Sequence, residues 1–175
     1  MPKIQSRTDV YKLLLDHGAS ARLIRHLELV GEAGGMLIEA LSTKGVPINA
    51  RLVELGIAVH DAGKILFPAE LDGPGSQHEA AGERMLLDLG VDATVAHCCV
   101  SHAAWAGADV TLEERLVALA DKLWKQKREE ALELLVIDEI ADRLSLTRWD
   151  VFSDLDALFE DIAAGATDRL ERSRV

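Results

Sequence analysis

Four side chains that can bind a metal ion are spread along the chain. His26 lies in RLIRHLELV, the adjacent pair His60 and Asp61 in AVHDAGK, and Asp121 in LVALADKL. Neutral imidazoles and carboxylates together suit zinc, iron, manganese or cobalt. Asp121 interrupts an otherwise apolar run, where a carboxylate is costly to bury unless an ion or a hydrogen-bond partner compensates it. From spacing alone, a shared metal site and four separately packed or solvent-facing side chains both remain open.

Helices must position these residues, because no segment alternates between apolar and polar residues as a strand does. Capping boxes are expected at Ser6–Asp9, Ser76–Glu79, Thr111–Glu114 and Thr147–Asp150, and helix ends at Gly18 and Gly90. Helices are predicted over about 7–17, 20–43, 49–63, 77–89, 92–102, 112–128, 130–145 and 148–170. The longest loop is expected over about 64–76. The chain therefore reads as all-α, a compact bundle of about seven or eight helices.

The composition favours one globular domain and excludes some partners. The chain has 175 residues, of which 49% are hydrophobic and 28% charged, which is enough to bury a core. The net charge of −11 comes without a basic stripe, so no nucleic-acid partner is expected. No apolar run is long enough for a membrane span and no leader is recognisable, so we expect a cytoplasmic protein without membrane contact. The adjacent Cys98 and Cys99 are expected to be buried rather than disulfide-bonded.

The C-terminal part of the chain differs in charge from the rest. Residues 129–175 hold 13 acidic and 5 basic side chains. We expect residues 1–175 to form a single domain, with 129–175 as an acidic helical extension. The sequence indicates neither the role of this extension nor the oligomeric state.

The ordered set His26, His60–Asp61 and Asp121 resembles that of the HD-domain superfamily of metal-dependent phosphohydrolases. HDAGK at 60–64 is similar to the HDxGK motif of the family, and ADK at 120–122 to its final aspartate motif. The resemblance runs from about residue 20 to 128. It implies an HD-type helical bundle in which these four residues hold one metal ion.

Two further histidines lie between the His–Asp pair and Asp121. His78 is in QHEAAGERML and His102 in VAHCCVSHAAW, where HD proteins with two metals carry extra histidines. The resemblance implies a second ion held by His78 and His102, with Asp61 bridging the two. In the one-metal alternative, these histidines contact the substrate instead. The expected cofactor is a divalent transition metal, two ions of Fe, Mn, Co or Zn.

Three residues are candidates for catalysis at such a centre. Asp61 would bridge two metals that orient a phosphate and offset charge on the leaving oxygen. Lys64 would clamp a phosphate, or else be a solvated lysine favoured by a helix end. Glu79 would act as a general acid or support a ligand histidine. The simpler interpretation makes Glu79 only the capping partner of Ser76.

The other histidines and two tryptophans are expected to lie outside the metal site. His17 precedes a glycine at a helix end and is expected at the surface. His97 diverges from His102 by about 140° around a helix, so it is not counted as a ligand. Trp105 and Trp124 could stack on a nucleobase, but core packing is the favoured interpretation.

The resemblance predicts a metal-dependent phosphohydrolase, a phosphatase or phosphodiesterase that cleaves a phosphate ester or anhydride of a small nucleotide-like molecule. The layout is similar to that of the symmetrical bis(nucleosyl)-tetraphosphatases, without assigning their substrate. HD-GYP phosphodiesterases carry a histidine doublet and a GYP string where this chain has SHAAWAGADV, so cyclic di-GMP is not expected. A di-iron oxygenase of the HD type could use the same six residues. A non-catalytic signalling module would typically have lost some of them.

Overall fold

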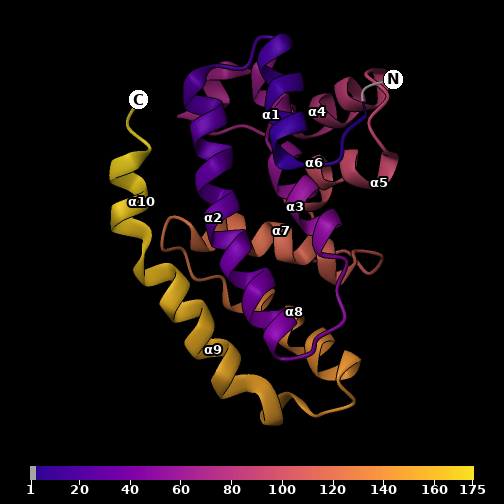
Figure 1. Ribbon diagram of the computed structural model, residues 1–175, viewed down its shortest axis with the longest axis vertical. Coiled ribbons are helices and arrows are strands. Elements are labelled where there is room, and N and C mark those ends of the chain that lie inside the picture. Colours follow the sequence, from indigo (N-terminus) through magenta and orange to yellow (C-terminus); the bar gives the residue numbers. More distant parts are fainter. Residues whose placement is uncertain (1–2) are drawn as a thin grey trace.

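The computed structural model describes residues 3–175, which form ten α-helices and two 3-10 helices without any strand (Figure 1). The α-helices are α1 (Arg7–Asp16), α2 (Ala21–Thr43), α3 (Ala50–Val59), α4 (Gln77–Asp88), α5 (Ala93–Ala96), α6 (Cys98–Ser101), α7 (Leu112–Leu123), α8 (Glu130–Arg143), α9 (Arg148–Ala164) and α10 (Ala166–Arg172). The 3-10 helices are η1 (Ala62–Ile65) and η2 (Pro68–Leu71). The predicted all-α fold class is confirmed.

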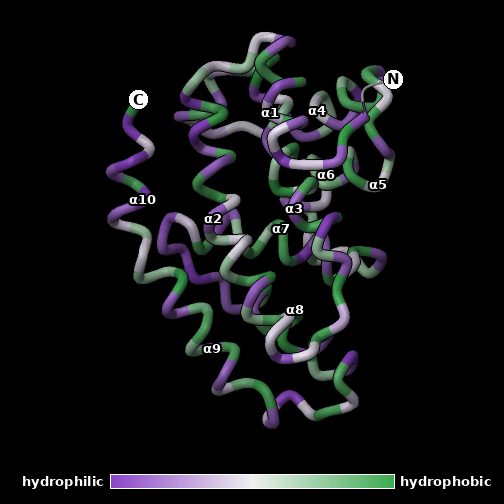
Figure 2. The backbone as a smooth tube through the Cα atoms, in the orientation of Figure 1, coloured by the Kyte–Doolittle hydropathy of each residue, from purple (hydrophilic) through white to green (hydrophobic). Residues whose placement is uncertain are grey.

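The centre of the fold is the contact between α2, α3 and α7. Leu27, Leu37 and Leu116 are fully buried there, and each such side chain contributes about 1.5–3 kcal/mol of hydrophobic stabilisation. Hydrophobic segments recur along these helices with hydrophilic segments between them, as expected for helices with one buried side (Figure 2). Gly34 of α2 lets α3 approach closely, because a Cβ atom at this position would lie 2.2 Å from Cδ1 of Ile57.

Helix starts follow the predicted capping chemistry at three of the four positions. The boxes Ser6–Asp9, Thr111–Glu114 and Thr147–Asp150 are formed. The prediction for Ser76 and Glu79 is wrong, because the Ser76 side chain accepts no hydrogen bond from α4. The Glu70 carboxylate accepts from the backbone N–H groups of Gln77 and His78 instead. Glu79 is therefore not needed as a capping residue.

Several predicted helices are shorter or divided in the structure. The helix expected over 49–63 ends at Val59, and the helix expected over 112–128 ends at Leu123, shortly before the left-handed residue Gln126 at φ 66°. The segment 92–102 forms α5 and α6, which meet at His97. The two 3-10 helices take up six of the 13 residues of the predicted loop 64–76.

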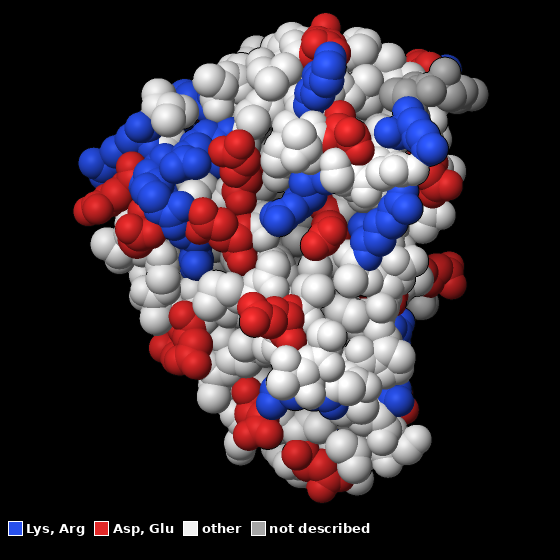
Figure 3. All heavy atoms as spheres, in the orientation of Figure 1, with Lys and Arg blue, Asp and Glu red and all other residues white. Residues whose placement is uncertain are grey.

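The C-terminal extension packs back on the helices that precede it. α8 lies against α7, and α9 lies against α8 and α2. The helix expected over 148–170 is divided at Gly165 into α9 and α10, which run along one side of the bundle (Figure 1). Lys and Arg side chains gather over α10 and the adjacent part of α2, interleaved with Asp and Glu (Figure 3). None of the helices described is long and apolar enough to cross a membrane.

Candidate metal centre

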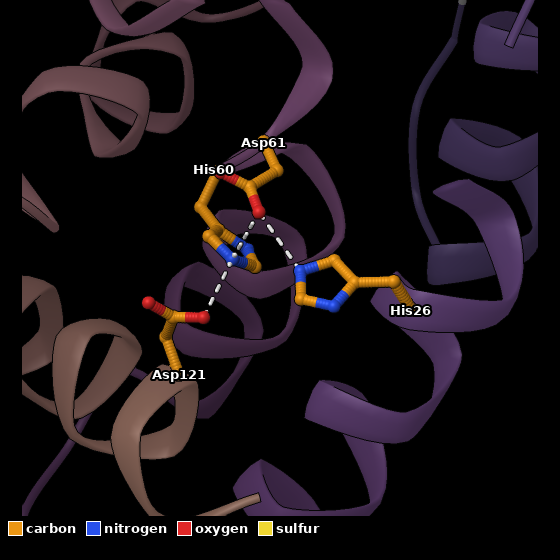
Figure 4. A group of neighbouring side chains, drawn as sticks. All are labelled: His26, His60, Asp61 and Asp121. Atoms are coloured by element: carbon orange, nitrogen blue, oxygen red, sulfur yellow. Dashed lines mark hydrogen bonds and ion pairs between the residues drawn. The ribbon is translucent and has the colours of Figure 1, made fainter. Parts of the chain in front are cut away.

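The six predicted donor residues come together at one place in the fold. Their donor atoms form two groups, within each of which all atoms lie within 4.8 Å of one another. One group is His26, His60, Asp61 and Asp121, and the other is Asp61, His78 and His102. The side chains of the first group point toward a common centre from α2, the end of α3 and α7 (Figure 4). Asp61 belongs to both groups.

The end of α3 allows two consecutive residues to face the same centre. Within a helix, His60 and Asp61 would point about 100° apart. α3 ends at Val59, and the backbone of Asp61 turns out of the helix at φ −107° and ψ 16°. Nε2 of His60 lies 3.4 Å from Oδ2 of Asp61 as a result. The early end of this helix therefore helps to build the site.

A close backbone contact brings His78 to Asp61. A Cβ atom at Gly63 would lie 1.8 Å from the carbonyl oxygen of His78, and one at Gly82 would lie 2.7 Å from the backbone nitrogen of Gly63. Only residues without a side chain permit η1 and α4 to touch in this way. Nε2 of His78 lies 3.2 Å from Oδ1 of Asp61.

Backbone carbonyls orient two of the imidazole rings. Nδ1 of His60 lies 2.7 Å from the carbonyl oxygen of Ile57, and Nδ1 of His102 lies 3.1 Å from that of Cys98. A ring that donates its Nδ1–H to a carbonyl keeps the lone pair on Nε2. In both residues Nε2 faces the carboxylates of the site.

His78 is held by Glu70, a residue that the sequence analysis missed. Nδ1 of His78 lies 2.5 Å from Oε2 of Glu70, the same carboxylate oxygen that accepts the backbone N–H of His78. A carboxylate behind a histidine fixes the ring and makes it a stronger ligand. Glu70 gave no signal in the sequence, because it lies in a segment predicted as a loop.

The donor set fits a divalent transition metal. The Nε2 atoms of His60 and His78 are buried and have no hydrogen-bond partner in the described structure. Nε2 of His60 also lies 3.4 Å from Oδ1 of Asp121. Buried ring nitrogens without a hydrogen bond are unfavourable, and a cation between them and the carboxylates would satisfy both. Imidazole and carboxylate ligands of this kind suit Zn, Fe, Mn or Co.

Neighbouring groups strongly shift the protonation of the site. Burial opposes a charge on His60, but the carboxylates of Asp61 and Asp121 raise its pKa to about 10. Burial also opposes ionisation of Asp61, yet the charge on His60 and a hydrogen bond from His26 hold its carboxyl pKa well below the usual value. Burial and the charge on His60 lower the pKa of His102 to about 4. A metal ion bound here would compete with a proton on His60 for the same carboxylates.

The donor groups lie in a pocket of about 590 Å³ with cationic side chains around it. Lys64 is only 13% exposed, and its Nζ lies 2.8 Å from Oδ2 of Asp61, so it is not a solvated surface lysine. Arg22 lines the pocket and is paired with Asp72. Lys122 and Lys125 also line the pocket, and no carboxylate described in the structure lies within ion-pair distance of them. These two lysines follow Asp121 closely in the sequence, and their spacing could have indicated them.

The remaining candidates divide between the pocket and the core. Glu79 lines the pocket, and burial raises the pKa of its carboxyl. Trp124 also lines the pocket, but it is 7% exposed and packs edge-on against His26 at a ring-centroid distance of 5.1 Å. Trp105 is partly buried against the core. The packing of both tryptophans agrees with the favoured interpretation, in which they contribute to the core.

Other predictions about individual side chains also agree with the structure. His97 is half exposed and pairs with Glu83, and His17 is exposed, so both lie outside the two groups. Cys98 and Cys99 are buried and free, as expected. Burial raises the pKa of Cys98 to about 12, which makes a thiolate unfavourable.

Comparison with known proteins defines the class to which this architecture belongs. Residues 23–125 match the HD domain family, and the chain is a member of that family. An uncharacterized protein of Methanocaldococcus jannaschii is 29% identical over 126 residues, which cover 63% of this chain and 70% of that protein. No solved structure gives a significant match. The matched region includes all six donor residues and ends before α8.

Proposed function

We propose that this chain is a metal-dependent phosphohydrolase that cleaves a phosphate ester or anhydride of a small nucleotide-like molecule. One observation carries the proposal: two donor groups share Asp61 in a pocket that also presents lysines without carboxylate partners. Members of the HD domain family are typically metal-dependent phosphohydrolases. The pocket volume of about 590 Å³ lies in the range of small-molecule sites.

The proposed cofactor is a pair of divalent transition-metal ions. The first would be held by His26, His60, Asp61 and Asp121, and the second by Asp61, His78 and His102. Bound there, the ions would supply positive charge to the phosphate oxygens and lower the pKa of a water molecule. Asp61 would contribute its carboxylate to both positions.

Positively charged side chains would bind and orient the substrate. Lys64 lies beside Asp61 and lines the pocket, where its ammonium group could contact a phosphate oxygen. Lys122 and Lys125 would attract the anion locally, against the unfavourable net charge of −11. Leu71 and Ala103 would provide apolar surface for the rest of a nucleotide-like molecule.

Glu79 is the proposed general acid. Its carboxyl lines the pocket and does not cap α4. Because burial raises its pKa, Glu79 retains a proton at higher pH than an ordinary glutamate and can donate it to the leaving oxygen.

A screen of phosphorylated metabolites with metal-loaded protein tests the proposal. We expect turnover of a phosphate ester or anhydride that is abolished by a chelator and by Asp61→Ala. Normal turnover by Asp61→Ala would refute the site assignment. If iron-loaded protein consumed oxygen and hydrolysed no phosphorylated compound, the oxygenase alternative would replace this proposal.

A further inference from the structure

Arg169 of α10 is a buried cation beyond the region that matches the family. Its side chain is 4% exposed, and no carboxylate in the described structure lies within ion-pair distance of it. Nε donates to the carbonyl oxygen of Trp124 at 3.0 Å, and Nη2 donates to that of Leu123 at 3.3 Å. Nη2 also donates to the carbonyl oxygen of Ile162. Three backbone carbonyls therefore take the place of a carboxylate partner.

These carbonyls belong to the C-terminal ends of two helices. α7 ends at Leu123 and α9 ends at Ala164, and the last carbonyls of a helix have no partner within the helix. A helix C-terminus also carries partial negative charge, which favours a nearby cation. The planar guanidinium of Arg169 offers five donors in a fixed arrangement, so it can connect both helix ends. Burial lowers the pKa of the Arg169 guanidinium, because the charged form is separated from water.

The break between α9 and α10 makes room for this guanidinium. A Cβ atom at Gly165 would lie 2.9 Å from Nη1 of Arg169. α10 is also held by the ion pair between Arg172 and Glu32, and Nε of Arg25 donates to the carbonyl oxygen of Arg172 at 2.9 Å. These contacts fix α10 beside α2 (Figure 1).

The end of α7 that Arg169 holds contributes to only one of the two donor groups. Asp121 lies two residues before Leu123, and the Trp124 ring packs against His26. Asp121 and His26 both belong to the four-residue group. The three-residue group draws His78 from α4 and His102 from the end of α6.

We propose that Arg169 is a positioning residue that holds Asp121 and His26 in place and thereby sets the metal affinity of the four-residue group selectively. This inference rests on the proposed function, because it requires that both donor groups bind metal ions. It gives the C-terminal extension a role at the site that the family match does not include.

Replacement of Arg169 by Met tests this role, because Met keeps most of the buried stem and removes the donors. Co²⁺ binding is titrated against a competing chelator, and circular dichroism follows the fold. We expect one of two binding constants to weaken by about ten- to a hundredfold, as for other groups that orient ligands, while the second is unchanged. Arg148→Met, which removes a partly exposed ion pair with Asp138 elsewhere in the C-terminal extension, should leave both constants unchanged. Arg169→Lys should recover part of the lost affinity, since an ammonium group can still donate to the carbonyls.

Equal weakening of both constants in Arg169→Met, or no weakening, would overturn the positioning role. If Arg169→Met does not fold, Gly165→Ala displaces the guanidinium more mildly. We expect Gly165→Ala to lose metal affinity at the four-residue group alone, and the same results would refute the proposal. The measurement does not depend on turnover, so it stands even if no substrate is found. A wild-type protein that binds no Co²⁺ would instead refute the metal assignment on which the proposed function rests.

Discussion

Glu70 should control the second metal position through His78. Its carboxylate accepts hydrogen bonds from Nδ1 and from the backbone N–H of His78, and from the backbone N–H of Gln77. In Glu70→Gln, a neutral acceptor remains for the helix but the negative charge behind the imidazole is lost. We expect the metal affinity of the three-residue group to fall by about tenfold or more, which corresponds to about 1.4 kcal/mol.

Glu70→Ala should have a second effect, on stability. It also removes the cap of α4, and loss of a helix cap costs about 1 kcal/mol. For a chain of this length, that loss should lower Tm of the metal-free protein by about 2–4 °C. Glu70→Gln should lower Tm less than Glu70→Ala does, because its single amide oxygen can still accept from one of the two backbone N–H groups of α4.

Metal titration and thermal melts of both variants separate these effects. The matched control is Glu83→Gln, because Glu83 accepts from Nδ1 of the exposed His97 at 2.7 Å, outside both donor groups. This control should retain both metal affinities. If Glu70→Gln bound both ions as tightly as the wild type, the argument that Glu70 strengthens His78 as a ligand would be refuted.

Three further predictions follow from the site and from its support. His102→Ala should lose one of two bound metal ions with the fold retained; metal analysis that still finds two ions would remove this residue from the ligands. Lys64→Ala should keep its metal but lose about ten- to a hundredfold in kcat/KM for a phosphorylated substrate, whereas Lys127→Ala, outside the pocket, should not. Wild-type kinetics in Lys64→Ala would exclude the phosphate clamp. Glu113→Ala should lower the free energy of unfolding by about 2 kcal/mol, since it removes a partly buried pair with Arg143. Burial opposes ionisation of Glu113, but Arg143 holds its pKa below the usual value, so this stabilisation is present at neutral pH and is lost as the pH falls through the folded pKa. The free energy of unfolding, measured by urea melts, should therefore change less between pH 7 and pH 3 for the variant than for the wild type. An equal change in both proteins would contradict the pairing argument.

The sequence alone determined the donor residues and most of the helices. The residue types of His26, His60 and Asp121 made them candidate donors, and the resemblance to the HD family implied that they share one site. Capping boxes and helical periodicity are local properties, which is why the starts of α1, α7 and α9 were predicted correctly.

Only the tertiary structure decided which residues support the site. Ser76 was the local choice for capping α4, but Glu70 reaches the same amides across the preceding turn and holds His78 as well. Arg169 donates a hydrogen bond to the carbonyl oxygen of Trp124, which is 45 positions away in the sequence. Arg169 lies just after a break in a segment that the sequence predicts as one continuous helix. Such contacts depend on how whole helices pack, and the energy that selects them comes from burial of groups that are distant in the chain. No local pattern encodes that packing, so the candidate donors could be identified from the sequence while the residues that hold them in place could not.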